Sequence, residues 1–168
     1  MNRSYGNMPQ DSRLELLRAD GNSDMDSMLA QSFAEVFNAE PWNDNWTHQQ
    51  ALERIRDIEN TPRFDGAAVI RDGKVIAAIL GRGEQYYDGE VFQIIEFWVA
   101  NAFQRQGIGS RLLEDFTEHL KEKGIHKVFL LTMRGERTEG FYKKQGFQTI
   151  SNMCLMEKRF QEEDKDEI

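Results

Sequence analysis

A buried strand, a glycine-containing turn and an amphipathic helix are predicted in immediate succession, and this arrangement constrains the fold more than any other feature. The run from Val91 to Val99 is almost continuously apolar, as expected for a central strand that is covered on both faces. The segment after the turn carries apolar residues at helical spacing and ends at Gly124. A further apolar strand, Lys127 to Thr132, completes a parallel strand–helix–strand crossover.

The segment before this crossover predicts one strand and two helices. Arg13 to Arg18 alternates like a strand. Apolar residues at three- and four-residue steps then form one face of a helix that ends at Pro41: Met25, Met28, Leu29, Phe33, Val36 and Phe37. Thr47 opens a second helix with the form of a capping box, and this helix continues to Thr61-Pro62.

Two short apolar runs, residues 67–70 and 75–80, surround Arg71-Asp72-Gly73-Lys74, which is a strong hairpin turn. After the crossover, Thr138 can cap a short helix that runs through Gln145, and residues 147–156 predict a last strand. The sequence therefore predicts an α/β (α+β) fold in which helices flank a mixed, mostly antiparallel central sheet with one parallel crossover.

The chain of 168 residues has the size of one compact domain. We place this domain at residues 13–160, between a flexible N-terminal arm, 1–12, and an acidic C-terminal tail, 161–168, because neither end has apolar periodicity. The tail carries five acids and one lysine, so it supplies −4 of the formal net charge of −8. A mildly acidic domain disfavours a nucleic-acid partner and is compatible with a cationic substrate.

No apolar run approaches the roughly eighteen residues that a bilayer-spanning helix needs, and the N-terminus lacks the apolar stretch of a signal peptide. We therefore expect a cytoplasmic protein without a membrane partner. One cysteine, Cys154, and three scattered histidines offer neither an internal disulfide nor a metal-ligand spacing. No metal is expected.

The turn itself, Phe103 to Ser110, lies at a helix start, where backbone N–H groups are unpaired and the helix dipole has its positive end. Gly107 and Gly109 permit a pyrophosphate to approach closely. The turn has neither the Gly-Lys-Ser/Thr ending of a P-loop nor a G-x-G-x-x-G fingerprint, which disfavours nucleoside triphosphates. The alternative is a turn that uses glycine only for its geometry.

These residues resemble the best-marked segment of the GNAT acetyltransferase superfamily, which is a strand ending in valine, then Gln/Arg-x-x-Gly-x-Gly/Ala, then an amphipathic helix. Val99 and Gln104 to Gly109 match this pattern. Gly140 to Phe147 is similar to the superfamily's F-Y-x-x-x-G-F signature. The resemblance covers about residues 15 to 158 and departs at Asn101, where many members have proline. It implies the GNAT acyl-CoA N-acyltransferase fold.

The resemblance implies acetyl-CoA as the cosubstrate. Its pyrophosphate is expected against the backbone of the turn, formed by Gln104, Arg105, Gln106, Gly107, Ile108, Gly109 and Ser110. Its pantetheine arm is expected to pair by strand addition with the edge formed by Phe97, Trp98 and Val99. This pairing requires the sheet to splay after residue 99. The side chain of Arg105 either adds charge near the phosphates or is solvated.

The resemblance also gives Tyr142, in the F-Y motif, the role of protonating the departing thiolate, unless its ring only packs against the cofactor. The backbone N–H near Trp98 or Val99 is the natural oxyanion donor. Glu96 interrupts an otherwise apolar strand, and a buried carboxylate is costly unless it is used or paired. Glu96 is therefore a candidate general base, or alternatively the structural partner of an arginine or part of the edge of a polar cleft.

Two segments before the central strand combine carboxylates with aromatic rings, which suits ammonium groups through charge pairing and cation–π contact. One segment contains Trp42, Asp44 and Trp46, and the other contains Tyr86 and Tyr87. We expect them to recognise the acceptor. Alternatively, the two tryptophans fill the junction between the first helices while the acids are solvated.

Together these features predict an N-acetyltransferase that moves the acetyl group of acetyl-CoA to a primary amine of a small cationic molecule. The acceptor is expected to resemble a polyamine or an aminoglycoside, and the amine to attack directly through a tetrahedral intermediate. Two alternatives stay open, a protein or peptide N-acetyltransferase and a non-catalytic acyl-CoA-binding module. A long Glu84–Gly89 connection would narrow a peptide groove, which favours a small acceptor. Homodimers are common in the superfamily, although no segment here marks an interface.

Overall fold

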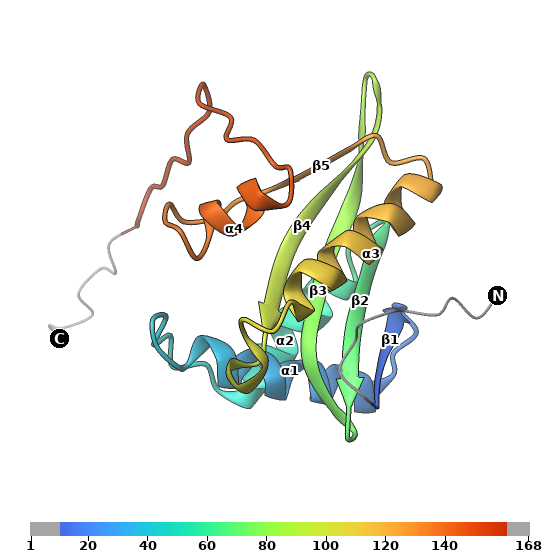
Figure 1. Ribbon diagram of the computed structural model, residues 1–168, viewed down its shortest axis with the longest axis vertical. Coiled ribbons are helices and arrows are strands. Elements are labelled where there is room, and N and C mark those ends of the chain that lie inside the picture. The colour runs from blue at the N-terminus through green and yellow to red at the C-terminus, as the bar shows by residue number, and fades with distance from the viewer. Residues whose placement is uncertain (1–10, 161–168) are drawn as a thin grey trace, which may run out of the picture. The chain divides into compact units, whose positions relative to one another are not determined.

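The structure, a computed structural model, describes residues 11–160 of the chain (Figure 1). The predicted tail and the first ten residues of the predicted arm lie outside this range. Ser12, the last residue of the predicted arm, already belongs to the first strand. The chain divides into two compact units, Met1–Leu131 and Thr132–Ile168.

The first unit is built on a five-stranded sheet in the order β1-β2-β3-β4-β5. Its strands are β1 (Ser12–Leu17), β2 (Phe64–Arg71), β3 (Lys74–Tyr86), β4 (Gly89–Val99) and β5 (Lys127–Leu130). The pairs β1–β2, β2–β3 and β3–β4 are antiparallel, whereas β4 and β5 are parallel. This topology confirms the predicted mixed sheet with one parallel crossover.

Helices cover both faces of this sheet. The helices α1 (Ser23–Phe37) and α2 (His48–Glu59) share one core cluster with alternate residues of the strands, including Leu80 and Trp98. The helix α3 (Ile108–Glu122) lies across the other face (Figure 1), where Phe116 packs edge-on against Phe92 with ring centroids 5.5 Å apart. Neighbouring residues of β4 therefore face different helices. Between residues 11 and 160, no helix is long and apolar enough to cross a membrane.

Side-chain hydrogen bonds stabilise the start of α2 and the loop that follows α1. Thr47 forms the predicted capping box, since Gln50 N donates to Thr47 Oγ1 at 3.2 Å and Thr47 N donates to Gln50 Oε1 at 3.0 Å. The predicted end of α1 at Pro41 is wrong, because the helix already ends at Phe37. After this end, the side-chain amide of Asn38 makes two hydrogen bonds with the backbone of Trp46. It donates to the carbonyl at 2.8 Å and accepts from the N–H at 2.5 Å.

The β2–β3 turn is confirmed, since Asp72 and Gly73 have φ values of 51° and 71°, as the two central residues of a type I′ turn require. Both strands are longer than the predicted apolar runs because polar residues at their ends remain in the ladder. The interpretation of Glu84–Gly89 as a long connection is wrong. This segment is the tip of the β3–β4 hairpin, in which Tyr86 pairs with Gly89.

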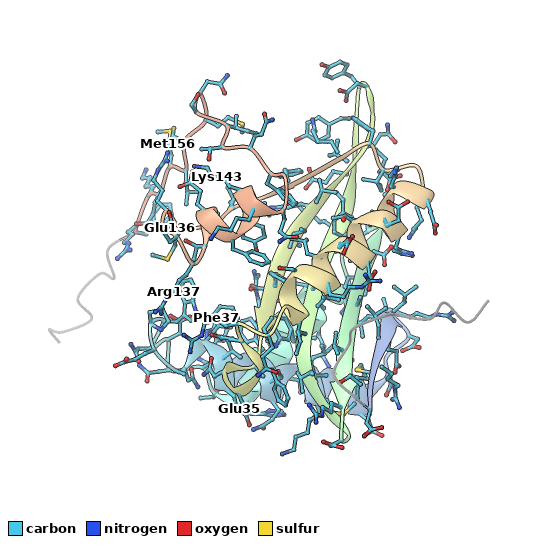
Figure 2. The ribbon with its side chains drawn as sticks, viewed as in Figure 1. Glu35, Phe37, Glu136, Arg137, Lys143 and Met156 are labelled. Atoms are coloured by element: carbon cyan, nitrogen blue, oxygen red, sulfur yellow. The ribbon has the colours of Figure 1, made fainter. Side chains whose placement is uncertain are left out.

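The second unit contains the helix α4 (Glu139–Lys144). Thr138 has the predicted N-cap position, but its hydroxyl donates to the carbonyls of Met133 and Gly135, at 2.6 and 3.3 Å. Glu139 accepts a hydrogen bond from Thr149 and lies 2.8 Å from the ammonium of Lys143, which Figure 2 shows on α4. The hydrogen bond from Lys143 lowers the pKa of Glu139.

The predicted last strand at residues 147–156 is wrong, because these residues form no strand. Their apolar character resembles that of a strand, but a strand also requires a ladder partner for its backbone. Within the described part of the second unit, no other strand offers that partner.

Candidate functional site

The turn between β4 and α3 has the geometry that an anion-binding helix start requires. A short 3-10 helix, Asn101–Phe103, leads from β4 into the turn, and Gly107 occupies the N-cap position of α3 with a left-handed φ of 80°. Because this N-cap residue is a glycine, it has no side chain of its own to cap α3. The positive end of the helix dipole is therefore not compensated by an N-cap carboxylate or hydroxyl, which favours an anionic ligand.

The two glutamine side chains of this turn form hydrogen bonds with nearby residues of the same segment. Gln104 Nε2 donates to the carbonyl of Val99 at 3.0 Å and to the side chain of Asn101 at 2.9 Å. Gln106 Nε2 donates to the carbonyl of Ala102 at 3.0 Å. The buried Ile108 anchors the start of α3, while Arg105 is exposed. The turn therefore offers a ligand chiefly its backbone, and the binding of a pyrophosphate by residues 104–110 stays a prediction.

The strands part earlier than predicted. The β4–β5 ladder ends at the pair Ile94–Leu130, and the β3–β4 ladder has a bulge at Ile95, because Gly81 pairs with Ile94 and Leu80 with Glu96. A bulge bends its strand and re-aims the side chains that follow. Gly81 permits this close approach, since a Cβ there would lie 2.1 Å from the carbonyl oxygen of Gln93. The predicted splay after residue 99 thus begins after residue 94.

The predicted edge residues Phe97, Trp98 and Val99 lie beyond the last β5 partner. The side chain of Trp98 is buried in the core under α1, where Trp98 Nε1 donates to Ser32 Oγ at 3.0 Å. Only the backbone of Trp98 is therefore suited to a ligand at this edge.

Glu96 lies on the same face of β4 as Trp98, and its side chain is 16% exposed. Arg54 reaches it from α2, with Nε and Nη2 at 3.0 and 2.8 Å from the same oxygen, Oε1. Burial raises the pKa of Glu96, the hydrogen bonds and charge of Arg54 lower it, and the charge of Asp44 raises it. Glu96 therefore does pair with an arginine, and its role as a general base stays a prediction. Which arginine it would be had no signal in the sequence, because the partner lies 42 positions away.

The first predicted acceptor segment packs against α1. The ring of Trp46 lies edge-on to Phe33 with centroids 5.1 Å apart, and the ring of Trp42 lies 5.8 Å from that of Phe37, the residue at the end of α1 in Figure 2. This arrangement confirms the interpretation that the two tryptophans fill the helix junction. Asp44 is exposed and accepts from Trp46 Nε1 at 3.2 Å. Because its charge acts on Glu96, the fold brings Asp44 and Glu96 into one neighbourhood.

The second predicted segment lies at the opposite end of the sheet, at the tip of the β3–β4 hairpin (Figure 1). Tyr87 is 98% exposed, and the ring of Tyr86 contacts Lys127, whose Nζ is 5.2 Å from the ring centroid. Gly89, the partner of Tyr86 at this tip, lies seven positions before Glu96 on β4, which corresponds to roughly 23 Å. The structure therefore does not bring Tyr86 and Tyr87 together with Asp44.

Tyr142 lies on α4 in the second unit, where its ring packs edge-on against Phe141 and Phe147 with centroid distances of 5.1 and 5.6 Å. Both phenylalanines belong to the F-Y-x-x-x-G-F signature. The signature thus builds a small aromatic cluster around this tyrosine.

A cavity of about 520 Å³ lies near the other end of α3, where Asp65, His119 and Lys123 contribute to its lining. Asp65 Oδ2 lies 3.0 Å from His119 Nε2 and 2.5 Å from Lys123 Nζ. The length of α3, roughly 20 Å, separates this cluster from Gly107. No group of three or more His, Cys, Asp or Glu residues that could hold a metal occurs between residues 11 and 160.

The acetyltransferase (GNAT) family matches residues 25–147 of the chain. An uncharacterised N-acetyltransferase of Chlorobaculum tepidum is 30% identical over 73 residues, which are 44% of this chain and 44% of that protein. The chain thus matches less than half of the length of this relative.

Two solved structures are similar over most of their length. An aminoglycoside acetyltransferase from an uncultured soil metagenomic sample, in complex with sisomicin, has 17% identity and a TM-score of 0.66, covering 91% of this chain and 97% of that one. The glucosamine-6-phosphate N-acetyltransferase of Arabidopsis thaliana has 19% identity and a TM-score of 0.64, with 89% and 99% covered. At such identities the likeness shows the fold. Because the family match spans most of the sequence and both its marked turn and its fold are present, the chain belongs to the acetyltransferase (GNAT) family.

Proposed function

We propose that the protein is an acetyl-CoA-dependent N-acetyltransferase whose acceptor is a primary amine of a small cationic molecule. One observation carries this proposal. The bulged end of β4, beyond its last pair with β5, bears Glu96, which pairs with Arg54, and leads directly into the helix start at Gly107. The proposed binding site for the anionic coenzyme A and the carboxylate proposed to contact the acceptor amine therefore lie on one short segment of the chain.

Acetyl-CoA supplies an activated acetyl thioester. The backbone of residues 104–110 is proposed to hold its pyrophosphate, because the left-handed Gly107 at the start of α3 suits an anion. The backbone of Phe97, Trp98 and Val99 is proposed to pair with its pantetheine amides, because the β5 ladder ends before these residues.

The chain is proposed to contribute three groups to the transfer. Glu96 takes a proton from the acceptor amine, so that the nitrogen lone pair can form the new C–N bond. A backbone N–H near Trp98 or Val99 donates to the carbonyl oxygen as its negative charge grows. Tyr142 gives its hydroxyl proton to the sulfur as the C–S bond breaks, a role that rests on the F-Y signature.

The charges near Glu96 favour a cationic acceptor. Glu96 and Asp44 carry two negative charges and Arg54 carries one positive charge, which leaves one negative charge in excess. This excess attracts an ammonium group. The two structural neighbours are named for aminoglycosides and glucosamine-6-phosphate, which agrees with a small amine. We leave Tyr86 and Tyr87 out of the acceptor site because of their place at the hairpin tip.

The test is a thiol-release assay with acetyl-CoA and a panel of polyamines, aminoglycosides, amino acids and short peptides. We expect a small cationic amine to stimulate release, and Glu96→Gln to lower kcat/KM by about 100-fold or more. Tyr142→Phe should reduce turnover while the affinity for coenzyme A stays unchanged.

Three outcomes would contradict the proposal. Release that no amine stimulates would favour the non-catalytic binding module. Release that only peptides stimulate would favour a peptide N-acetyltransferase. Full activity of the Glu96→Gln variant would remove Glu96 from the mechanism and leave an acceptor that binds already neutral.

A further inference from the structure

The contact between Arg54 and Glu96 uses only one side of the carboxylate. An arginine fork can take both oxygens of a carboxylate, one with each N–H. Here Nε and Nη2 of Arg54 converge on Oε1, at 3.0 and 2.8 Å. Within residues 11–160, Glu96 Oε2 accepts no hydrogen bond. The contact therefore fixes the carboxylate while one of its oxygens keeps both lone pairs for another donor.

The position of Arg54 on α2 suits a residue that orients Glu96 better than it suits a fully solvated surface charge. Its neighbour Ile55 is fully buried in the core that α1 and α2 share, so the backbone of α2 at this position is held by packing. The Arg54 side chain is 40% exposed and that of Glu96 is 16% exposed. The guanidinium thus connects a helix that packs into the core with a strand residue that is largely buried.

We propose that Arg54 is a positioning residue of the acceptor site, which holds Oε1 of Glu96 so that Oε2 is left to take the proton of the acceptor amine. This inference rests on the proposed function. In the transfer, the amine proton moves to Oε2, the nitrogen electron pair forms the C–N bond, and the C–S electron pair leaves with the sulfur. Arg54 gains and loses no proton.

The charge of Arg54 has a second consequence, because it opposes the effect of burial on Glu96. Arg54 on α2 and Asp44 in the loop before α2 are the charged groups that act on Glu96, and its partner on β3 is Leu80. Arg54 is the cation of this set, and it lowers the pKa that burial and Asp44 raise. Without Arg54, Glu96 should stay protonated to higher pH and serve as a base only in more alkaline solution.

The experiment compares the pH dependence of kcat/KM for the wild type, Arg54→Gln and Arg54→Lys, using the best acceptor from the thiol-release panel. We expect the acid limb of Arg54→Gln to move to higher pH by about one unit, so that activity on that limb falls by about tenfold and recovers in alkaline solution. Arg54→Lys should keep the limb near its wild-type position, because it keeps the charge, but lower the plateau, because it lacks the planar fork.

Arg56→Gln is the matched control. Arg56 is on the same helix and also pairs with a buried carboxylate, since Arg56 Nε lies 3.1 Å from Asp26 Oδ2. It does not act on Glu96. This variant should keep the wild-type acid limb even if its stability is lower.

A second readout does not depend on turnover. In protein with ¹³C-labelled glutamate, the carboxyl signal of Glu96 can be assigned from its loss in Glu96→Gln and then titrated by NMR. It should titrate at higher pH in Arg54→Gln than in the wild type. An unchanged titration, or a loss of activity that is equal at every pH, would overturn the role of Arg54. A wild type that shows no amine-stimulated release would instead overturn the proposed function, whatever the titration shows.

Discussion

The buried carboxylate of Glu59 couples the stability of this fold to pH. Its side chain is 6% exposed at the end of α2, and Asp26 of α1 is 4% exposed. Burial, and then the charge and hydrogen bond of Asp26, raise the pKa of Glu59 from 4.5 to about 7. The folded state therefore keeps a proton that the unfolded state has already lost, so stability falls as the pH rises from 4.5 to about 7 and is level above that.

Glu59→Gln tests this coupling. The variant should be more stable than the wild type at about pH 8, by up to roughly 3 kcal/mol, and little changed near pH 4, where the wild-type carboxyl is neutral. Urea unfolding at both pH values measures the difference. Glu53→Gln removes a carboxylate from an exposed position of the same helix and should show no such pH dependence. A Glu59→Gln effect of equal size at both pH values would contradict the assignment.

At the scale of the element, α3 has a left-handed glycine at each end. Gly107 has a φ of 80° and Gly124 a φ of 88°, and a Cβ added to either would meet nothing within 4 Å. The two positions therefore impose a similar backbone cost on any other residue, about 1 kcal/mol or somewhat more. Only Gly107 lies at the proposed pyrophosphate turn.

We predict that Gly107→Ala and Gly124→Ala destabilise the protein by similar amounts but that only Gly107→Ala weakens coenzyme A binding. The expected loss is roughly tenfold in Kd, or about 1.4 kcal/mol, because the added Cβ makes the turn relax away from the φ that aims its N–H groups. Calorimetric titration with coenzyme A measures the affinity. Equal affinity of the two variants for coenzyme A would argue against a coenzyme A site at the turn that contains Gly107.

In the molecule as a whole, the two proposed binding sites lie on different faces of the sheet. Glu96 and Trp98 lie on the face that α1 and α2 cover, near the loop that contains Asp44. The helix α3 covers the other face and begins at the turn that is proposed to bind coenzyme A. The end of β4 joins both, so occupancy of the turn should stabilise the cooperative unit that contains this sheet.

Coenzyme A at about 100 times its Kd should therefore add about 2.7 kcal/mol to the free energy of unfolding and raise Tm by roughly 5 to 10 °C. Differential scanning calorimetry measures this shift. Pantetheine, which lacks the diphosphate, should give a smaller shift at the same concentration. A wild-type Tm that is the same with and without coenzyme A would contradict the proposed carrier site.

The features that depend on local periodicity and turn chemistry could be predicted from the amino-acid sequence alone. The apolar run of β4, the glycine turn and the amphipathic α3 predicted the crossover, and Thr47 and Asp72-Gly73 predicted a helix start and a hairpin. These features could be predicted because each rests on the φ preferences and hydrogen bonds of neighbouring residues.

Which distant residues meet depends on how the whole chain packs, and the sequence did not reveal it. Packing of α2 on the sheet selected Arg54 as the partner of Glu96, and the bulge at Ile95 set where β4 leaves β5. Pairing along the β3–β4 hairpin carried Tyr86 away from Asp44, and the strand predicted at 147–156 did not form for want of a ladder partner in its unit. Ladders and ion pairs of this kind depend on the free energy of the whole packed chain, which no local pattern contains.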